Sequence, residues 1–470
     1  MSKEYKLAED GNSYIVFDIK PSKTYFSIEK EYKGLPVTSI GFYAFWRCKK
    51  IKNITIPNSI ITIGEGAFNE CSGLIDIIIP ESVNSIGKNV FCGCNKLQTI
   101  IVEEDNSKYD SRDNCNAIIE TATNTLILGI QSTIIPNTVT SVASLAFKAC
   151  GALKSIAVPN SVKNIGDSAF KECYNLKTIT LSNSLENIEN DTFWGCCRLK
   201  GVKIPESVIS IGKGAFYGCE SLKSIEISKS VTAIESNSFL RCTNVKTVIV
   251  NINNSKYDSR GNCNAIIETA TNTLIFGCQS TIIPLDVTSI GDYAFYGCLN
   301  LTNISIPNRV TSIGASAFEH CQFISSFLLP SSLINVHNSA FSGCSNLTNI
   351  VIPNSVESIG SSVFWDCIRL NNAVLSSAMT RIEYGTFAHC YNLDWVLIPN
   401  SITSICDFAF EFSSLKKVYY KGNSNEWNNI SIEGNNRKLM SATIYYYSEE
   451  EPIEEGNYWH YDLDGNPLNW

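Results

Sequence analysis

The side chains best suited to chemistry in this 470-residue chain are nineteen cysteines and four histidines. Two of the histidines directly precede a cysteine, in His320-Cys321 and His389-Cys390. A thiol beside an imidazole is the pair that thiol hydrolases use as nucleophile and base. Adjacent side chains usually point in different directions, however, and most equivalent positions in this chain carry the cysteine without the histidine. We therefore predict a protein that is not an enzyme, with a thiol-dependent hydrolase as the alternative.

Most of the cysteines follow a phenylalanine by three residues. They are Cys48, Cys71, Cys94, Cys150, Cys173, Cys196, Cys219, Cys242, Cys298, Cys321, Cys344, Cys367 and Cys390. This spacing lacks the close pairs of ligands that structural zinc sites use, and one strand spacing between parallel side chains suits a disulfide poorly. We expect a column of buried, reduced thiols that pack as small hydrophobic groups, with no metal and no cofactor. Outside this column, Cys92 and Cys197 are predicted to be the more reactive thiols.

The phenylalanines reveal an internal repeat. They are Phe45, Phe68, Phe91, Phe147, Phe170, Phe193, Phe216, Phe239, Phe295, Phe318, Phe341, Phe364, Phe387 and Phe410. Every interval is 23 residues except two of 56, and 56 is two periods plus ten residues. Each long interval therefore contains one altered coil, which makes about sixteen coils in total.

Each coil carries a short alternating segment, as at Ile225 and Ile227, often followed by proline and a polar turn. A second apolar pair, such as Val162 and Ile165, is interpreted as the approach to the Ala-Phe turn. One coil is too small to bury its apolar residues alone, so coils must stack. The predicted fold is a leucine-rich-repeat solenoid of 23-residue coils, whose short parallel strands form a curved sheet capped at both ends.

The two long intervals are near-copies of each other, 148 residues apart. In each, two apolar pairs flank a Thr-Ala-Thr-Asn turn, which predicts a small hairpin projecting from the coil. The domain prediction is an N-terminal cap over 1–35, a repeat array over 36–416, and a C-terminal cap and tail over 417–470. The hairpin-bearing altered coils are expected at about 104–136 and 252–284.

Charge and hydropathy exclude several classes of partner. A net charge of −8 provides no basic surface for nucleic acid or anionic lipid. No run of about 18 apolar residues is present, so we expect no insertion into a membrane. The first residues are polar and lack the apolar segment of a secretory signal, so no signal peptide is expected in this sequence.

The predicted outward strand positions are mostly short and polar in the early coils but become apolar in the last four. The candidate ligand-binding residues are Leu328, Val351, Val374, Trp395 and Leu397. A contiguous apolar stripe on an open sheet usually marks a contact surface. Two alternatives remain open, namely that the C-terminal tail covers the stripe and that these residues only reflect strand propensity.

A second group of aromatic residues directly follows the repeated phenylalanine: Trp46, Trp194, Tyr217, Tyr296 and Trp365. Exposed aromatic rings could stack on sugars or anchor a protein, whereas packed rings would fill the turns between coils. We expect packing, with the exposed arrangement as the alternative.

The phrase Ile-Gly-x-x-Ala-Phe-x-x-Cys-x-x-Leu-x-x-Ile-x-Ile-Pro-Asn-Ser-Val closely resembles the BspA-type (Treponema pallidum-type) leucine-rich repeat, over roughly residues 35 to 416. The resemblance implies a bacterial surface or secreted, adhesin-like scaffold that recognises a host or bacterial protein, with a glycan as the alternative ligand. The missing signal sequence departs from this pattern and leaves a cytoplasmic location open.

Overall fold

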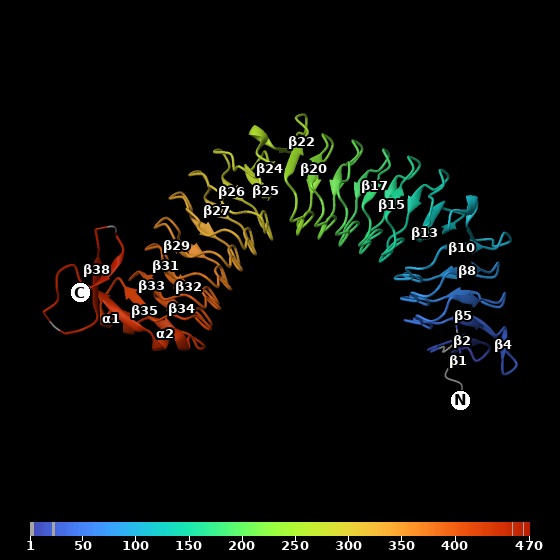
Figure 1. Cartoon of the computed structure of the whole chain (residues 1–470), viewed down its shortest axis with the longest axis horizontal. Coiled ribbons are helices and arrows are strands. Elements are labelled where there is room, and N and C mark those ends of the chain that lie inside the picture. The colour runs from blue at the N-terminus through green and yellow to red at the C-terminus, as the bar shows by residue number, and fades with distance from the viewer. Residues whose placement is uncertain (1–3, 21–23, 454, 464) are drawn as a thin grey trace. The chain divides into compact units, whose positions relative to one another are not determined.

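The computed structural model describes residues 4–20, 24–453, 455–463 and 465–470 (Figure 1). The chain divides into two compact units, Met1–Cys242 and Thr243–Trp470. In both units the chain winds into stacked turns, and the described residues form about 19 turns of about 23 residues. The predicted solenoid is therefore confirmed, although the sequence analysis counted about sixteen turns.

In each unit, one ladder of strands contains the alternating segment that the sequence predicted. The strands at this position in the first unit are β3 (Tyr25–Ser27), β6 (Asn53–Thr55), β8 (Asp76–Ile79), β10 (Thr99–Val102), β15 (Ser155–Ala157), β17 (Thr178–Thr180) and β20 (Ser224–Ile227). Those of the second unit are β22 (Thr247–Val250), β29 (Asn349–Val351), β31 (Asn372–Val374), β33 (Trp395–Ile398), β35 (Lys417–Tyr420) and β37 (Thr443–Tyr447). Neighbours pair in parallel, as Ile156 does with Ile179, because equivalent residues of successive coils run in the same direction.

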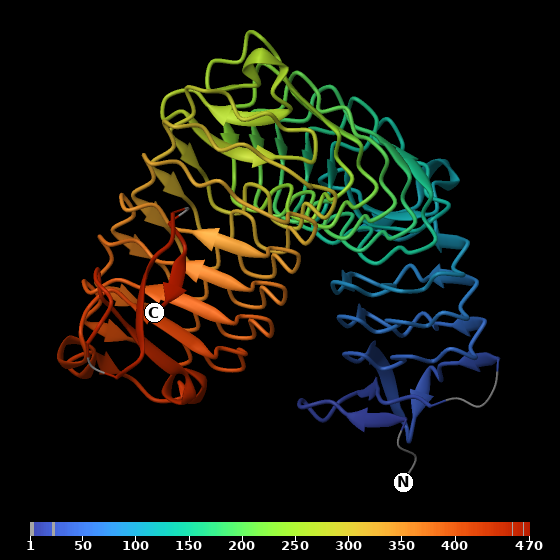
Figure 2. The ribbon, with the colours of Figure 1, turned by 60° about the vertical axis from the view of Figure 1, so that its left-hand side comes forward.

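A second parallel ladder lies where the sequence analysis expected only an approach to the turn (Figure 2). In the first unit it contains β2 (Tyr14–Val16), β5 (Leu35–Ile40), β7 (Thr62–Ile63), β9 (Ser85–Ile86), β13 (Thr125–Gly129), β14 (Ser141–Val142), β16 (Asn164–Ile165), β18 (Asn187–Ile188), β19 (Ser210–Ile211) and β21 (Ala233–Ile234). In the second unit it contains β25 (Thr273–Gly277), β26 (Ser289–Ile290), β27 (Ser312–Ile313), β28 (Asn335–Val336), β30 (Ser358–Ile359), β32 (Arg381–Ile382), β34 (Ser404–Ile405) and β36 (Ser431–Ile432). Most of these strands have two residues, too few to show an alternation in the sequence.

The core of each unit is a stack of the repeated phenylalanine rings. Phe193 and Phe216 are fully buried, with ring centroids 5.3 Å apart, and Phe295 and Phe318 lie 5.0 Å apart in the second unit. The spacing of the rings matches the spacing of the strands, so within a run of regular coils each ring stacks on that of the next coil.

The altered coil of the first unit contains the expected antiparallel hairpin, but the hairpin does not project. β12 (Ala117–Glu120) pairs with β13, and β13 in turn pairs in parallel with β14 of the next coil. Ile118 and Ile119 are fully buried, because β12 packs inside the stack. The second unit repeats this arrangement with β24 (Ala265–Glu268) and β25.

An arginine holds each altered coil together. The Arg112 guanidinium donates to Asp110, Asn124 and Thr138, and so joins β11 (Tyr109–Asp110) to the hairpin turn and to the coil that follows. This arginine lies in a short 3₁₀ turn, η1 (Arg112–Asn114). In the second unit, η2 (Arg260–Asn262) follows β23 (Tyr257–Asp258) and places Arg260 in the same role.

The terminal segments add turns to the stack, which accounts for the higher count. β2 pairs in parallel with β5, and β3 with β6, so the segment before the first predicted coil already forms a turn. At the other end, β35 and β37 continue the ladder of β33. β1 (Tyr5–Leu7) and β4 (Glu31–Tyr32) flank the first turns, while α1 (Ser424–Asn428), α2 (Arg437–Ser441), β38 (Tyr458–Tyr461) and β39 (Pro467–Asn469) complete the C-terminal end.

Parts of the predicted caps, namely residues 1–3, 21–23, 454 and 464, lie outside the described residues. In the described part of the chain, we find no helix with the length and hydropathy needed to span a bilayer.

Candidate ligand-binding face

The predicted stripe forms one continuous column on the strand ladder of the second unit. Val351 lies opposite Val374, and Val374 lies opposite Leu397. Leu328 precedes them in the adjacent coil, which is joined to β29 by a bridge between Ser326 and Asn349. Trp395 is two residues before Leu397 on β33, so its side chain is on the same face. The structure therefore brings all five predicted residues together.

Exposure along this column falls steeply toward the C-terminus. Leu328 is 87% exposed and Val351 is 61% exposed, whereas Leu397 is only 4% exposed. Val374 and Trp395 are intermediate. The stripe is thus open at the Leu328 end and closed at the Leu397 end.

The closed end is covered by aromatic side chains that follow the repeat array. Leu397 forms a buried cluster with Tyr419 and Trp459. The Tyr419 ring contacts Trp395 edge-on at 5.6 Å, and the fully buried Trp459 ring contacts Tyr419 at 5.7 Å. The Trp459 indole N–H donates to the carbonyl of Tyr420 at 3.0 Å. Tail docking, one of the alternatives from the sequence, therefore describes the Leu397 end only.

The aromatic residues that follow the repeated phenylalanines have mixed surroundings. Trp46 is half exposed, with the Arg47 guanidinium 4.5 Å from the centre of its ring. Trp194 and Tyr217 stack nearly parallel at 5.3 Å, and the Lys171 ammonium lies 4.6 Å from the Trp194 ring. In the Trp194–Tyr217 pair, packing between neighbouring turns already occupies one face of each ring.

The cysteine column has a more specific role than that of small hydrophobic groups. The Cys196 thiol donates to the carbonyl of Phe170, at 3.2 Å, in the preceding coil. The same bond recurs along the stack, from Cys71, Cys94, Cys173, Cys196, Cys219, Cys242, Cys321, Cys344, Cys367 and Cys390. Burial raises the pKa of the Cys196 thiol to about 12, so it stays protonated and able to donate. All nineteen cysteines are free thiols, and the predicted column is buried except at Cys150, which is partly exposed.

The two His-Cys neighbours are directed apart. The buried Cys321 thiol donates to the Phe295 carbonyl, and burial raises its pKa well above the ordinary value. The His320 ring lies near the Glu319 carboxylate, 3.6 Å away, and contacts Tyr296. At the other pair, the His389 ring approaches the Tyr391 hydroxyl at 2.7 Å. Neither thiol is placed or ionised as the nucleophile of a hydrolase would be.

Stacked parallel coils with a buried phenylalanine column define a leucine-rich-repeat scaffold. The model of the BspA type leucine rich repeat region matches residues 22–125, 124–246, 275–394 and 323–438, and the chain belongs to this family. Proteins of this family are typically found at the surface or are secreted. No curated protein matches the sequence.

Solved structures agree on the fold. A leucine rich cell surface protein from Faecalibacterium prausnitzii matches with a TM-score of 0.50 and 23% identity, over 91% of this chain and 95% of that chain. The pneumococcal vaccine antigen PcpA aligns over 95% of this chain and 92% of its own, with a TM-score of 0.47 and 21% identity. A leucine-rich repeat protein from Bacteroides ovatus aligns over 82% of this chain and 95% of its own, with a TM-score of 0.40 and 26% identity.

Proposed function

We propose that this protein is a non-enzymatic, adhesin-like scaffold at the bacterial surface or outside the cell, and that it recognises a protein through the open end of the apolar column. The observation that carries the proposal is the pair of exposed apolar side chains, Leu328 and Val351, on adjacent coils of a regular ladder. Exposing such a column to water is unfavourable unless a partner covers it.

The exposure gradient supports a defined binding site with a centre and an edge. Val374 and Trp395 are half-buried and border the open end, and Leu397 supports them from beneath the aromatic cover. Tryptophan is enriched among the residues that dominate protein interfaces, so Trp395 is the expected aromatic anchor of this site. Leu397 itself acts as a support in this proposal, because Tyr419 and Trp459 already cover it.

The proposed location follows from the family and from the surface protein whose fold is shared. A protein ligand is favoured over a glycan because the open residues are aliphatic. Sugar-binding faces usually present aromatic rings together with hydrogen-bonding groups.

The test is a binding screen of the full chain against immobilised extracellular matrix proteins and a glycan array, followed by Leu328→Asp and Val351→Asp. Each charge should weaken protein binding by about tenfold or more, since a carboxylate buried at an interface without a partner costs more than 1.4 kcal/mol. The matched control is Ile78→Asp, because Ile78 occupies an equivalent outward position in the first unit and is 51% exposed. Unchanged binding in both variants, or a ligand found only among glycans, would overturn the proposal.

A further inference from the structure

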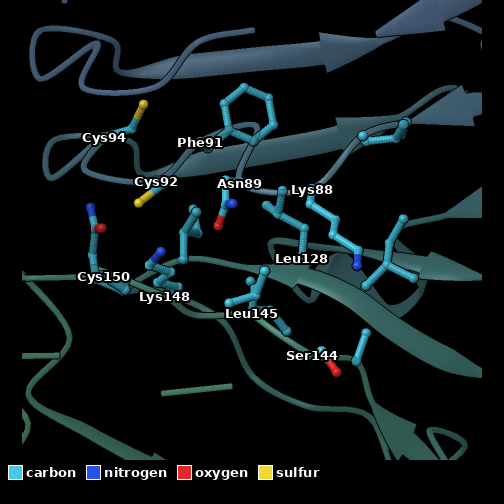
Figure 3. A pocket seen from close by; sticks show the side chains of 18 of the residues that line it. Lys88, Asn89, Phe91, Cys92, Cys94, Leu128, Ser144, Leu145, Lys148 and Cys150 are labelled. Carbon is cyan, nitrogen blue, oxygen red and sulfur yellow. The ribbon is translucent and has the colours of Figure 1, made fainter. Parts of the chain in front are cut away.

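A cavity of about 390 Å³ lies in the first unit where the regular repeat is interrupted (Figure 3). One wall is the turn that carries Phe91, and the others are the end of β13 and the turn that carries Phe147. Its size falls within the range of small-molecule sites. This site is distinct from the proposed protein-binding face, which belongs to the other unit.

The cavity exists because the altered coil lacks the turn that regular coils contribute. In regular coils, main-chain N–H groups of one turn donate to carbonyls of the next. Gly66 donates to Lys88 at 2.9 Å, and Phe68 donates to Val90 at 3.0 Å. The following coil is the altered one, whose hairpin replaces the turn that would accept the next set of bonds.

The interruption leaves main-chain donors of the cavity wall without acceptors. The N–H groups of Asn89 and Phe91, two residues that line the cavity, are equivalent to those that bond the next turn elsewhere, and within the described chain no acceptor is in hydrogen-bonding geometry with them. Buried N–H groups without acceptors are rare in proteins. On the opposite wall, the carbonyls of Ser144 and Lys148 likewise receive no protein donor from the described residues.

Two side-chain acceptors at the cavity are also unsatisfied. The buried Asn89 Oδ1 and Gln131 Oε1 atoms have no donor among the described residues. The Gln131 amide nitrogen donates to the Leu97 carbonyl, which leaves its oxygen as the free atom. Figure 3 shows the Asn89 side chain extending toward the segment of Leu145 and Lys148. An unpaired buried polar atom costs about 1–3 kcal/mol, so a ligand that donates hydrogen bonds here is favoured.

The charges at the cavity favour an anion. The exposed Lys88 and the half-buried Lys148 line it, and no ion pair of either ammonium group is found among the described residues. Glu120 supplies one opposing charge and accepts a hydrogen bond from the Thr123 hydroxyl. The remaining lining includes the aliphatic side chains of Leu128 and Leu145, which suit the C–H face of a ring.

We propose that this cavity binds a small polyhydroxylated carboxylate, such as a sugar acid. The carboxylate accepts hydrogen bonds from the unpaired N–H groups and from Lys148. The hydroxyl groups donate to Asn89 Oδ1 and Gln131 Oε1 after these two side chains turn toward the ligand, because neither oxygen is open to solvent in this structure. A ligand with only one of these two features leaves either the donors or the acceptors of the cavity unpaired.

The first test is isothermal titration of the full chain with glucuronate, glucose and hexanoate. Glucose has the hydroxyl groups without the charge, and hexanoate has the charge without the hydroxyl groups. Glucuronate is expected to bind at least about tenfold more tightly than either, because it alone satisfies both sets. No binding of glucuronate, or equal binding of all three, would overturn the proposal.

Two substitutions locate the binding. Lys148→Met removes the charge and Asn89→Leu removes the acceptor. Each substitution should lower the affinity for glucuronate by at least about tenfold. Leucine is tolerated at this position in the repeat, since Leu145 occupies it in the Phe147 coil with a φ of 66° against 56° for Asn89. Lys163→Met, an exposed lysine outside the cavity, is the matched control and should bind normally. Normal binding by a folded Lys148→Met variant would refute the assignment.

Cysteine alkylation gives an independent readout in the unmodified protein. The partly exposed Cys92 lines the cavity, whereas Cys197 is partly exposed outside it. Saturating glucuronate should slow alkylation of Cys92 at least several-fold, as followed by peptide mass mapping, and leave Cys197 unchanged. Equal rates at Cys92 with and without glucuronate would contradict binding in the cavity.

Discussion

Replacing Trp459 by alanine should uncover the closed end of the apolar column. The Trp459 side chain has 0% exposure and contacts Tyr419, Tyr447 and Tyr461, with ring centroids 4.9–5.7 Å away. Truncating a buried tryptophan costs about 3–5 kcal/mol, and that figure includes the hydrogen bond lost at the Tyr420 carbonyl. Since β38 pairs with β37, at the end of the ladder, and with β39, we expect the loss to appear as local opening of β37 to β39.

Amide hydrogen exchange measures this opening residue by residue. A local loss of about 4 kcal/mol corresponds to roughly a thousandfold faster exchange of amides in β37, such as Tyr445, while the first unit keeps its protection. Trp470→Ala is the matched control, because that ring is 46% exposed; it stacks on His460, 3.9 Å away, and its indole N–H donates to the Ser448 carbonyl at 3.0 Å. Exchange accelerated less than tenfold by Trp459→Ala would show that the aromatic cover does not stabilise the end of the stack.

Three further predictions concern the repeat array. Native alkylation should reach only the partly exposed Cys92, Cys150 and Cys197, and a mass spectrum with disulfides among the others would contradict the thiol column. Burial raises the pKa of the Cys196 thiol from 9.0 to about 12. The contribution of this thiol to stability should therefore be complete below pH 9 and lost as the pH rises toward 12. Alkaline denaturation without a transition between pH 9 and 12 would contradict this prediction. Arg112→Met should destabilise the hairpin-bearing coil by about 1.5–3 kcal/mol in chemical denaturation, and no change would show that its bonds to Asn124 and Thr138 are dispensable.

The repeat could be predicted from the sequence because every coil buries the same residue types at the same positions. The 23-residue spacing of the phenylalanines predicted the stack of coils, and the Ile-x-Ile segments predicted the parallel ladder, which Ile156 and Ile179 confirm. The second ladder was missed because two-residue strands such as Ser210–Ile211 carry no periodic signal. The thiol-to-carbonyl bonds were missed as well, since only stacking brings a cysteine next to the phenylalanine carbonyl of the preceding coil.

The candidate face was predicted as a row of residues, but its accessibility was not. Spacing placed Leu328, Val351, Val374 and Leu397 on one face, because equivalent positions of stacked coils align. Which of them remain exposed depends on Trp459, which follows Leu397 by 62 residues along the chain. The sequence allows the C-terminal tail as a cover, yet no repeat relates the tail to the coils, so its docking position could not be derived.

The amino-acid sequence by itself determined the coil, its period and its buried side, because those depend on local alternation and on the need of each coil for identical neighbours. It also marked the two interruptions through the 56-residue intervals. Only the tertiary structure decided which conformation the chain adopts at each interruption. The β12–β13 hairpin folds into the stack, and it leaves main-chain donors of the Phe91 turn without acceptors at the wall of a cavity. Hydrogen bonds between coils join residues more than twenty positions apart, so their loss at one break is visible only when the chain is stacked.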